Sequence, residues 1–428
     1  MRTPLVLAAA ALLAPLAAPA QSGTRMLRNP SISSTHIAFQ YAQDIWVVER
    51  AGGNARRLSS FPGDETNPQL SPDGKLVSFS AEYGGNSDVY VVPVTGGEPK
   101  RLTWHSGPDI VQGWSPDGKR ILFSSTRDTH GPNAAPKFYT IPVEGGIEEK
   151  VGMDRAMQGK YSPDGSKVAY RMNTSWDDER RNYRGGQNRP IWIMDTKTLD
   201  VVEAKPWTDS KDIDPTWIGD VVYFISDRDG VANVWGFDTK SQQMTQITTF
   251  KDFDVKSLDS DNTTLVIEQA GYIHTVDPRS KRHAIVNITA AGDFAHMLPQ
   301  WKDVSSRMTT MALSPSGARA LVEARGEVFS IPAQRGDVRN LTNSSGAAER
   351  QPTWSPDGKT IAYFSDASGE YALVLAPADG MGAKRVITLD KPKFYYTAEW
   401  SPDSKKLLYH DTDLNLWVMD IASGKAKI

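Results

Sequence analysis

A four-residue string, Ser-Pro-Asp-Gly, recurs along the chain at a nearly constant spacing and constrains the fold more than any other feature. Proline at the second position of a tight turn presets φ, and glycine accepts the conformation that follows. A period of roughly 40–50 residues is typical of the four-stranded blade of a β-propeller. The recurrence therefore predicts a repeat protein built from β-sheets. Full copies begin at Ser71, Ser115, Ser162 and Ser355, and variants begin at Ser314 and Ser401.

The unit over residues 67–103 shows how each copy is organised. After the turn at 71–74, strands are expected over 75–80, 88–92 and 99–103. Apolar, aromatic and β-branched residues bounded by Gly, Pro and Asp clusters are typical of strands. The same order of parts can be followed through nine copies.

Nine copies are too many for one ring, because propellers usually close with four to eight blades. The spacing lengthens across residues 288–311, which favours a boundary there. The sequence thus predicts an all-β protein with a six-bladed β-propeller over residues 26–290. Residues 291–311 are expected to be a linker or the start of a second ring. Residues 312–428 are expected to form about three blades of a second, truncated propeller.

The first twenty residues have the pattern of a cleavable signal peptide. Arg2 is followed by an apolar stretch over residues 5–16 and by the small residues Ala18-Pro19-Ala20. The alternative is an uncleaved anchor, but the stretch is shorter than the ~20 residues that span a membrane. We therefore predict a signal peptide over residues 1–20, no membrane span in the mature chain, and a periplasmic or secreted protein.

The composition argues against several kinds of site. The formal charge of −3 offers no basic surface for nucleic acid. The absence of cysteine excludes disulfides, thiolate metal sites and a cysteine nucleophile. The seven histidines show no zinc spacing, and no Gly-x-Ser-x-Gly nucleophile elbow is present. We accordingly expect no catalytic residue, no metal and no cofactor in this chain.

Two sets of recurring side chains are interpreted as structural. The aspartate of each Ser-Pro-Asp-Gly string is expected to accept hydrogen bonds from its own turn, rather than to bind calcium or transfer protons. The tryptophans that recur at the same position of successive copies, Trp114 and Trp217 among them, are expected to pack between blades rather than to stack on peptides.

The polar insert over residues 175–190 is the most unusual segment. Three acidic residues at 177–179 are followed by Arg180, Arg181 and Arg184. Arginine binds carboxylates through two parallel hydrogen bonds. We therefore hypothesise that these three arginines contact the substrate, as part of a loop at the propeller mouth that meets a peptide carboxylate or a neighbouring domain. The alternative is a solvated loop.

Taken in order, the motifs of the mature chain resemble the N-terminal part of the tricorn protease family. Single blade motifs also occur in TolB-like proteins and in many peptidases, whereas the ordered set with its non-repeating inserts is more specific. Besides the Ser-Pro-Asp-Gly strings, the resemblance rests on residues 44–48, 183–186, 224–230, 291–294, 323–327 and 363–371.

The resemblance implies an order of domains: a six-bladed propeller, a seven-bladed propeller, a PDZ-like domain and a C-terminal serine protease core. In that family the propellers are thought to act as sieves for unfolded peptides and products. The catalytic residues of the family lie in the protease domains, so no position in this chain matches them. Three blades of the second ring are present where the family has seven.

The function expected from the resemblance is substrate gating and scaffolding in an exported tricorn-like serine protease. The chain alone is expected to be inactive. Its expected partners are peptides or unfolded polypeptide and the C-terminal protease domains of the same protein, with a homo-oligomer in the full-length form. Two alternatives remain: a non-catalytic TolB-like propeller that binds partner proteins, and a propeller fused to another hydrolase such as an amidohydrolase.

Overall fold

The computed structural model describes residues 23–129, 134–172, 182–186, 188–294, 298–344 and 346–428. The predicted signal peptide and two of the three candidate arginines, Arg180 and Arg181, lie outside these ranges. Within them the chain forms nine sheets, each with four consecutive strands, and the first sheet has an additional fifth strand. The all-β class and the nine copies are confirmed, and the sheets are consistent with propeller blades.

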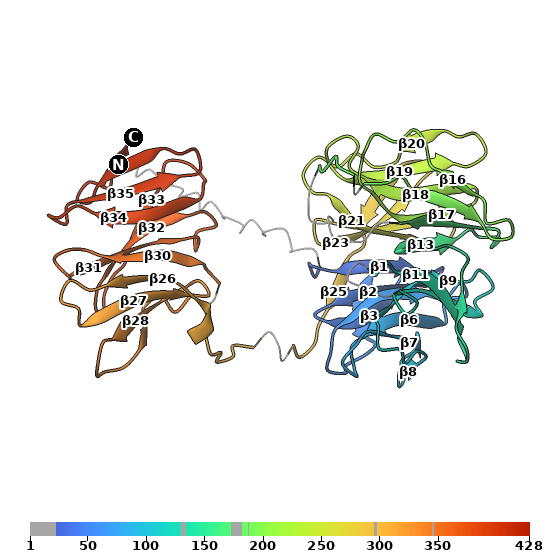
Figure 1. The fold of residues 1–428 in the computed structure, drawn as a ribbon, viewed down its shortest axis with the longest axis horizontal. Helices are drawn as coiled ribbons and strands as arrows, with labels where there is room; N and C mark the ends of the chain where they lie inside the picture. The colour runs from blue at the N-terminus through green and yellow to red at the C-terminus, as the bar shows by residue number, and fades with distance from the viewer. Residues whose placement is uncertain (1–22, 130–133, 173–181, 187, 295–297, 345) are drawn as a thin grey trace, which may run out of the picture. The chain divides into compact units, whose positions relative to one another are not determined.

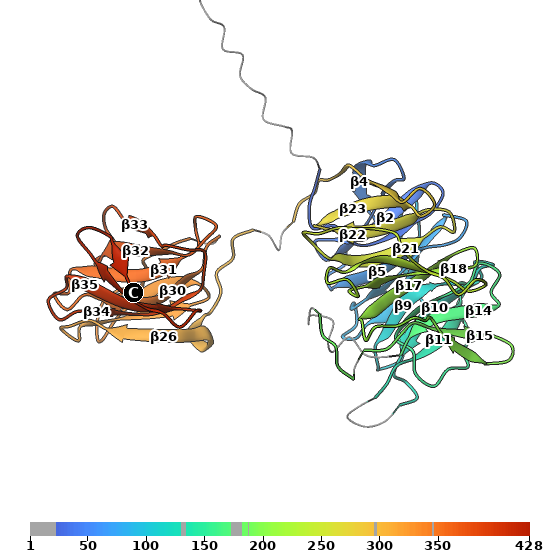
Figure 2. The same ribbon diagram turned by 90° about the horizontal axis from the view of Figure 1, so that it is seen from above.

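The chain divides into two compact units, one that ends at residue 296 and one that begins at residue 297. The first unit contains six sheets and the second contains three (Figures 1 and 2). Consecutive strands of a sheet pair antiparallel. A short 3-10 helix, η3 (Ser305–Arg307), precedes the first strand of the second unit.

The strands of the first three sheets are β1 (Arg28–Ile32), β2 (His36–Tyr41), β3 (Asp44–Glu49), β4 (Gly53–Arg57) and β25 (Ile288–Ala290); β5 (Glu65–Leu70), β6 (Leu76–Ala81), β7 (Asp88–Pro93) and β8 (Lys100–Arg101); and β9 (Asp109–Trp114), β10 (Arg120–Ser125), β11 (Lys137–Pro142) and β12 (Glu149–Lys150). Those of the next three are β13 (Gln158–Tyr161), β14 (Lys167–Arg171), β15 (Trp192–Asp195) and β16 (Val201–Glu203); β17 (Asp212–Ile218), β18 (Val221–Ser226), β19 (Asn233–Asp238) and β20 (Met244–Gln246); and β21 (Val255–Ser260), β22 (Leu265–Gln269), β23 (Tyr272–Asp277) and β24 (Arg282–Ile285).

The second unit contains β26 (Met308–Leu313), β27 (Arg319–Ala324), β28 (Glu327–Pro332) and β29 (Arg339–Asn340); β30 (Glu349–Trp354), β31 (Thr360–Ser365), β32 (Ala372–Pro377) and β33 (Arg385–Thr388); and β34 (Tyr395–Trp400), β35 (Lys406–Asp411), β36 (Leu416–Asp420) and β37 (Ala426–Lys427).

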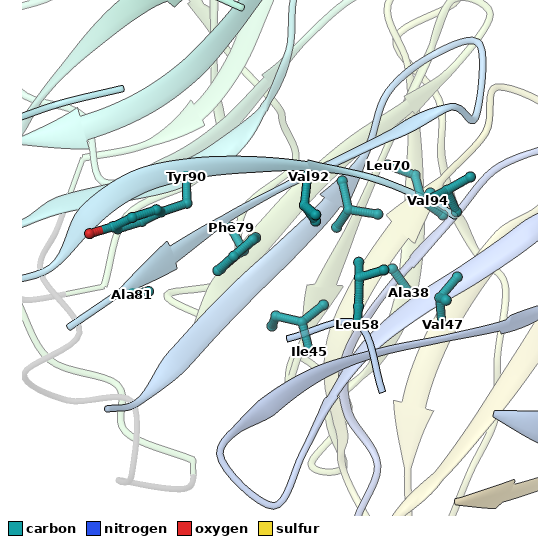
Figure 3. Close-up of a cluster of buried hydrophobic side chains, with 11 residues drawn as sticks. Ala38, Ile45, Val47, Leu58, Leu70, Phe79, Ala81, Tyr90, Val92 and Val94 are labelled. Atoms are coloured by element: carbon teal, nitrogen blue, oxygen red, sulfur yellow. The ribbon is translucent and has the colours of Figure 1, made fainter. Parts of the chain in front are cut away.

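Neighbouring sheets pack face to face through apolar side chains. Between the first two sheets, Ile45 and Leu58 meet Phe79 and Val92, and all four side chains are buried (Figure 3). Full burial of a side chain of this size stabilises the fold by about 1.5–3 kcal/mol. Each sheet therefore depends on its neighbours for most of its stability, as expected for a repeat architecture.

The first strands of the six sheets lie together at the centre of the first unit. Each one contacts the first strand of the next sheet, from β1 through β5, β9, β13 and β17 to β21. Strand β21 also contacts β1. The two ends of this unit therefore meet, and the residues that follow the sixth sheet return to the first one, where β25 pairs in parallel with β4.

Candidate functional site

The Ser-Pro-Asp-Gly turns hold their own aspartates. In the first full copy, Asp73 Oδ1 accepts hydrogen bonds from the Ser71 hydroxyl at 2.7 Å and from the Lys75 N–H at 3.1 Å. The same two bonds recur at Asp117, Asp164 and Asp357 of the other full copies and at Asp403 of the variant that begins at Ser401. Hydrogen bonds to the charged form lower the pKa of these carboxyls, and that of Asp164 falls to about 2. The structural interpretation of the aspartates is confirmed.

Arg184 is the one candidate arginine that lies within the described residues. Its Nη1 donates to both carboxylate oxygens of Asp227 at 3.0 Å, and its Nη2 donates to the Asp227 carbonyl at 2.8 Å. Asp227 is buried and also accepts from the N–H of Lys211. The guanidinium therefore joins the insert to the loop after β18, and a contact between Arg184 and substrate stays a prediction.

A cavity of about 420 Å³ lies among the first strands of the six sheets; we call it the larger cavity only in relation to the adjacent one of about 110 Å³ described next, since a cavity beside β18 and β23 has about 680 Å³. Every one of the six sheets contributes to its wall, which includes Ile32, Gln69, Trp114, Lys160, Trp217 and Asp259. Two tryptophans of this wall link neighbouring sheets. The Trp114 indole N–H donates to the Gln69 carbonyl at 2.9 Å, and that of Trp217 donates to the Lys160 carbonyl at 3.1 Å. The expected packing of these tryptophans between blades is confirmed.

A smaller cavity of about 110 Å³ lies among the same six strands. Its wall is mostly polar, and each first strand contributes to it: Asn29, Asn67, Gln112, Gln158, Asp214 and Ser257 are among its residues. Gln69 and Lys160 line both cavities. The two cavities are therefore adjacent, with these two side chains at their common boundary.

Bulges in the first strands bring polar side chains to the smaller cavity. Asn29, Asn67 and Asp214 have φ values of 47°, 52° and 56°, and the pairing register shifts at each of them. Asparagine and aspartate tolerate this left-handed conformation better than most residues. A β-bulge redirects a side chain and often lies next to a functional site.

The bulge side chains also bridge neighbouring sheets. Asn67 Nδ2 donates to the Val111 carbonyl of the third sheet at 3.4 Å, and Asp214 Oδ2 accepts from the Leu258 N–H of the sixth sheet at 3.0 Å. These residues were missed by sequence reasoning. The proline that follows each of them in the sequence could have indicated the bulges, because proline in a strand occurs only at edges, at the first residue or at bulges.

Lys160 crosses the boundary between the two cavities. It lies on β13 in the fourth sheet, yet its Nζ donates to Gln69 Oε1 of the second sheet at 2.6 Å and forms an ion pair with Asp259 of the sixth sheet. The side chains of Lys160 and Asp259 are 19% and 6% exposed. We call these two contacts the Lys160 bridge.

Asp214 makes the stability of the first unit depend on pH. Burial raises its pKa from 3.8 to about 6, against the opposing effects of the Leu258 N–H and Lys160. The folded state therefore binds the proton of the Asp214 carboxyl more tightly than the unfolded state does. The stability that this proton contributes is fully present below about pH 4 and is lost as the pH rises through about 6.

Replacing Asp214 with Asn is expected to remove this loss, because the amide oxygen can still accept from Leu258 and carries no charge. A rise in pKa from 3.8 to about 6 corresponds to about 3 kcal/mol. Because the Asp214 side chain keeps some contact with solvent, we expect a smaller gain, of about 1–2 kcal/mol, at pH 7.5 and little change at pH 4. Denaturant unfolding at both pH values measures it. An equal pH dependence in both proteins would contradict the assignment.

The described part of the chain contains no group of three or more His, Asp or Glu side chains placed to hold a metal ion. Among the same residues, no helix is both long enough and apolar enough to cross a membrane. We take the two adjacent cavities, the bulge residues and the Lys160 bridge as the candidate site.

Comparison with known proteins finds a matching family model and several similar sequences. Residues 24–282 match the family model of the tricorn protease N-terminal beta propeller domain. The tricorn protease homolog of Saccharolobus solfataricus is 27% identical over 404 residues, which are 93% of this chain and 36% of that protein. Tricorn protease homolog 1 of Streptomyces coelicolor is 26% identical over 413 residues, 94% of this chain and 38% of that protein.

A solved structure has a similar fold. The crystal structure of the tricorn protease matches with a TM-score of 0.56 at 18% identity, over 93% of this chain and 49% of that chain. The chain thus spans less than half of the length of these relatives.

Proposed function

The chain belongs to the tricorn protease family through its N-terminal β-propeller domain, and from this we propose that its first six sheets form a closed six-bladed propeller and its last three begin a second one. The contact between β21 and β1 and the pairing of β25 with β4 support the closure. So does Arg50 of the first sheet, which pairs with Asp261 and donates to Thr264 Oγ1 at 2.7 Å in the sixth.

The outer sheets of the second unit support the idea that further blades follow. On β26 the side chains of Met311 and Leu313 are each 75% exposed, and on β36 Leu416 is 59% exposed. Exposed apolar side chains gathered on a sheet face usually mark a surface that another element covers. In the proposed domain order, residues 26–290 form the first propeller, residues 291–311 lead into the second, and residues 312–428 form its first blades.

We propose that this chain is the substrate-gating and scaffolding region of an exported tricorn-like serine protease that hydrolyses peptides. The observation that carries this proposal is the pair of cavities among the six first strands. The larger one has tryptophan, proline and serine residues in its wall, which suits an extended polypeptide. The catalytic domains belong to the remainder of the full-length protein, which is proposed to form a homo-oligomer. Export rests on the signal-peptide pattern of residues 1–20.

Purified residues 21–428 are expected to bind unfolded polypeptide and to show no peptidase activity, whereas the full-length protein is expected to hydrolyse peptides. Binding is measured with a fluorescent unfolded polypeptide, and hydrolysis with quenched peptides in the presence and absence of a serine-directed reagent. If residues 21–428 hydrolysed peptides and the reagent abolished this activity, the proposal that catalysis resides in other domains would be refuted. Absence of binding by these residues would refute the gating role.

The hypothesis for the arginine insert is tested in the full-length protein. Replacing Arg180, Arg181 and Arg184 with Ala is expected to lower the turnover of long peptides several-fold, because a carboxylate contact at the mouth is lost. The matched control is Arg155→Ala, since Arg155 is exposed in the loop before β13. Unchanged turnover of long and short peptides alike in the triple variant would end the hypothesis.

A further inference from the structure

The two cavities of the first unit share two wall residues, whose side chains contact each other. Lys160 and Gln69 line both of them, and the other wall residues come from the same six strands and from the turns that follow them. A polypeptide passing from the larger cavity to the smaller one would therefore have to pass the side chains at their common boundary. What holds those side chains in place decides whether the passage is open.

Contacts to four other sheets hold Lys160 in place. Its ammonium contacts Gln69 in the second sheet and Asp259 in the sixth. Its aliphatic arm passes Gly113 of the third sheet, where a Cβ atom would lie 3.8 Å from the lysine carbons. Its carbonyl accepts the Trp217 N–H of the fifth sheet. The side chain thus extends across the space between the sheets instead of lying along its own strand.

We propose that the Lys160 bridge is a gate that closes the passage between the two cavities, and that polypeptide passes only when the Lys160 ammonium leaves Asp259 and Gln69. This inference rests on the gating role proposed above and names the residues that would perform it. Lysine suits the role because its ammonium sits on a flexible four-carbon arm and forms no fixed two-point contact. An arginine fork in this position would bind Asp259 through two bonds and resist displacement.

The surroundings of the bridge allow it to open. Lys160 is 19% exposed, so its ammonium can be hydrated when it leaves Asp259. A second carboxylate is available, because Asp214 lines the smaller cavity with Lys160 and interacts with it electrostatically. The ammonium can therefore move toward Asp214 without losing every anionic partner, and the gate has a closed and an open arrangement within one site.

The test uses the absence of cysteine from the chain. A single cysteine in place of Ser34, which is exposed at the larger cavity, is coupled to an extended ten-residue peptide with a photoreactive group at its far end. Such a peptide reaches about 30 Å. After irradiation, mass spectrometry identifies the residues that were crosslinked. Asn67 and Gln112 report passage, because they line only the smaller cavity.

With Lys160 present, crosslinks are expected on residues of the larger cavity. In the Lys160→Ala variant, crosslinks to Asn67 and Gln112 are expected to rise at least tenfold. A Lys160→Met, Asp259→Asn double variant should show the same rise in crosslinks as Lys160→Ala. It removes both charges together, so no unpaired carboxylate is left to disturb folding. The control is Lys256→Ala, since Lys256 also lines the smaller cavity but is exposed and takes no part in the bridge.

Equal crosslinking of Asn67 and Gln112 with and without Lys160, in variants that unfold at the same midpoint as the parent, would overturn the gate. This readout needs no proteolysis, so it is separate from the proposed function. If removal of Lys160 opened the passage but left hydrolysis of long peptides by the full-length protein unchanged, the gate would stand and the gating role in proteolysis would fall.

Discussion

Replacing Arg228 with Met is expected to destabilise the first unit by about 3–5 kcal/mol, because it leaves the buried carboxylate of Asp212 without its cation. Arg228 Nη2 lies 3.0 Å from Asp212 Oδ2, and the two side chains are 7% and 0% exposed. The hydroxyls of Ser210 and Ser226 donate to the other carboxylate oxygen at 2.8 Å and 2.6 Å. Methionine keeps an apolar arm against Trp235, over which the guanidinium stacks at 4.9 Å, so the change removes charge more than packing.

The loss is expected to depend on pH with a definite sign. Burial already raises the pKa of Asp212 to about 6, and without Arg228 it would rise further. Above the pKa that Asp212 has in the variant, the folded state must bury an unpaired carboxylate. Below that pKa, the folded state binds a proton at Asp212 and regains stability. Denaturant unfolding should therefore show a larger difference from the parent at pH 7.5 than at pH 5.

A second variant separates charge from shape. Adding Asp212→Asn to Arg228→Met should recover part of the lost stability, since no buried charge remains and the amide oxygen still accepts from the serines. The matched control is Lys240→Met, because Lys240 pairs with Asp220 at the surface and should not contribute measurably. A double variant no more stable than the single one would show that the pair contributes through packing and not through charge.

Replacing Ile288 with Ala is expected to destabilise the first unit by about 2–5 kcal/mol, the cost of deleting a large aliphatic side chain from a core. Ile288 is 1% exposed and packs in the cluster that contains Leu27, Trp46 and Val266. Its carbonyl accepts the Thr24 N–H at 2.7 Å. The side chain thus joins residues from both ends of the first unit, where the proposed ring closes.

Thr289→Ala is the control for this experiment, because Thr289 lies on the same strand but is exposed. Chemical denaturation followed by tryptophan fluorescence measures both variants, and Thr289→Ala is expected to leave the midpoint nearly unchanged. If the two substitutions cost the same, β25 would not be a structural closure of the first unit, and the proposed six-bladed ring would lose its main support.

The strands around each turn could be predicted because their signals are local. The strand expected over residues 75–80 is β6 (Leu76–Ala81), and the one expected over 88–92 is β7 (Asp88–Pro93). The last strand was expected over 99–103, and only Lys100–Arg101 pair. No strand was predicted before the turn, but the residues there form the first strand β5, whose bulge at Asn67-Pro68 interrupts the alternation that would have revealed it.

A buried Arg–Asp pair at equivalent places in two sheets was not foreseen. Arg127 lies 2.6 Å from Asp109 in the third sheet, as Arg228 does from Asp212 at 3.0 Å in the fifth. Each arginine follows a strand end by two residues, and each aspartate begins the first strand of its sheet. Arginine and aspartate in a sequence usually indicate exposed positions. The burial of these pairs becomes apparent only in the structure, where the sheets pack around them.

Short-range patterns were therefore sufficient for the repeat, its turns and most of its strands, since turn chemistry and strand alternation act over a few neighbouring residues. The meeting of the first and sixth sheets and the Lys160 bridge depend on residues separated by about 90 to 240 positions along the chain. Such contacts leave no periodic trace, because each is made once, by side chains that only the packed sheets bring within hydrogen-bonding distance.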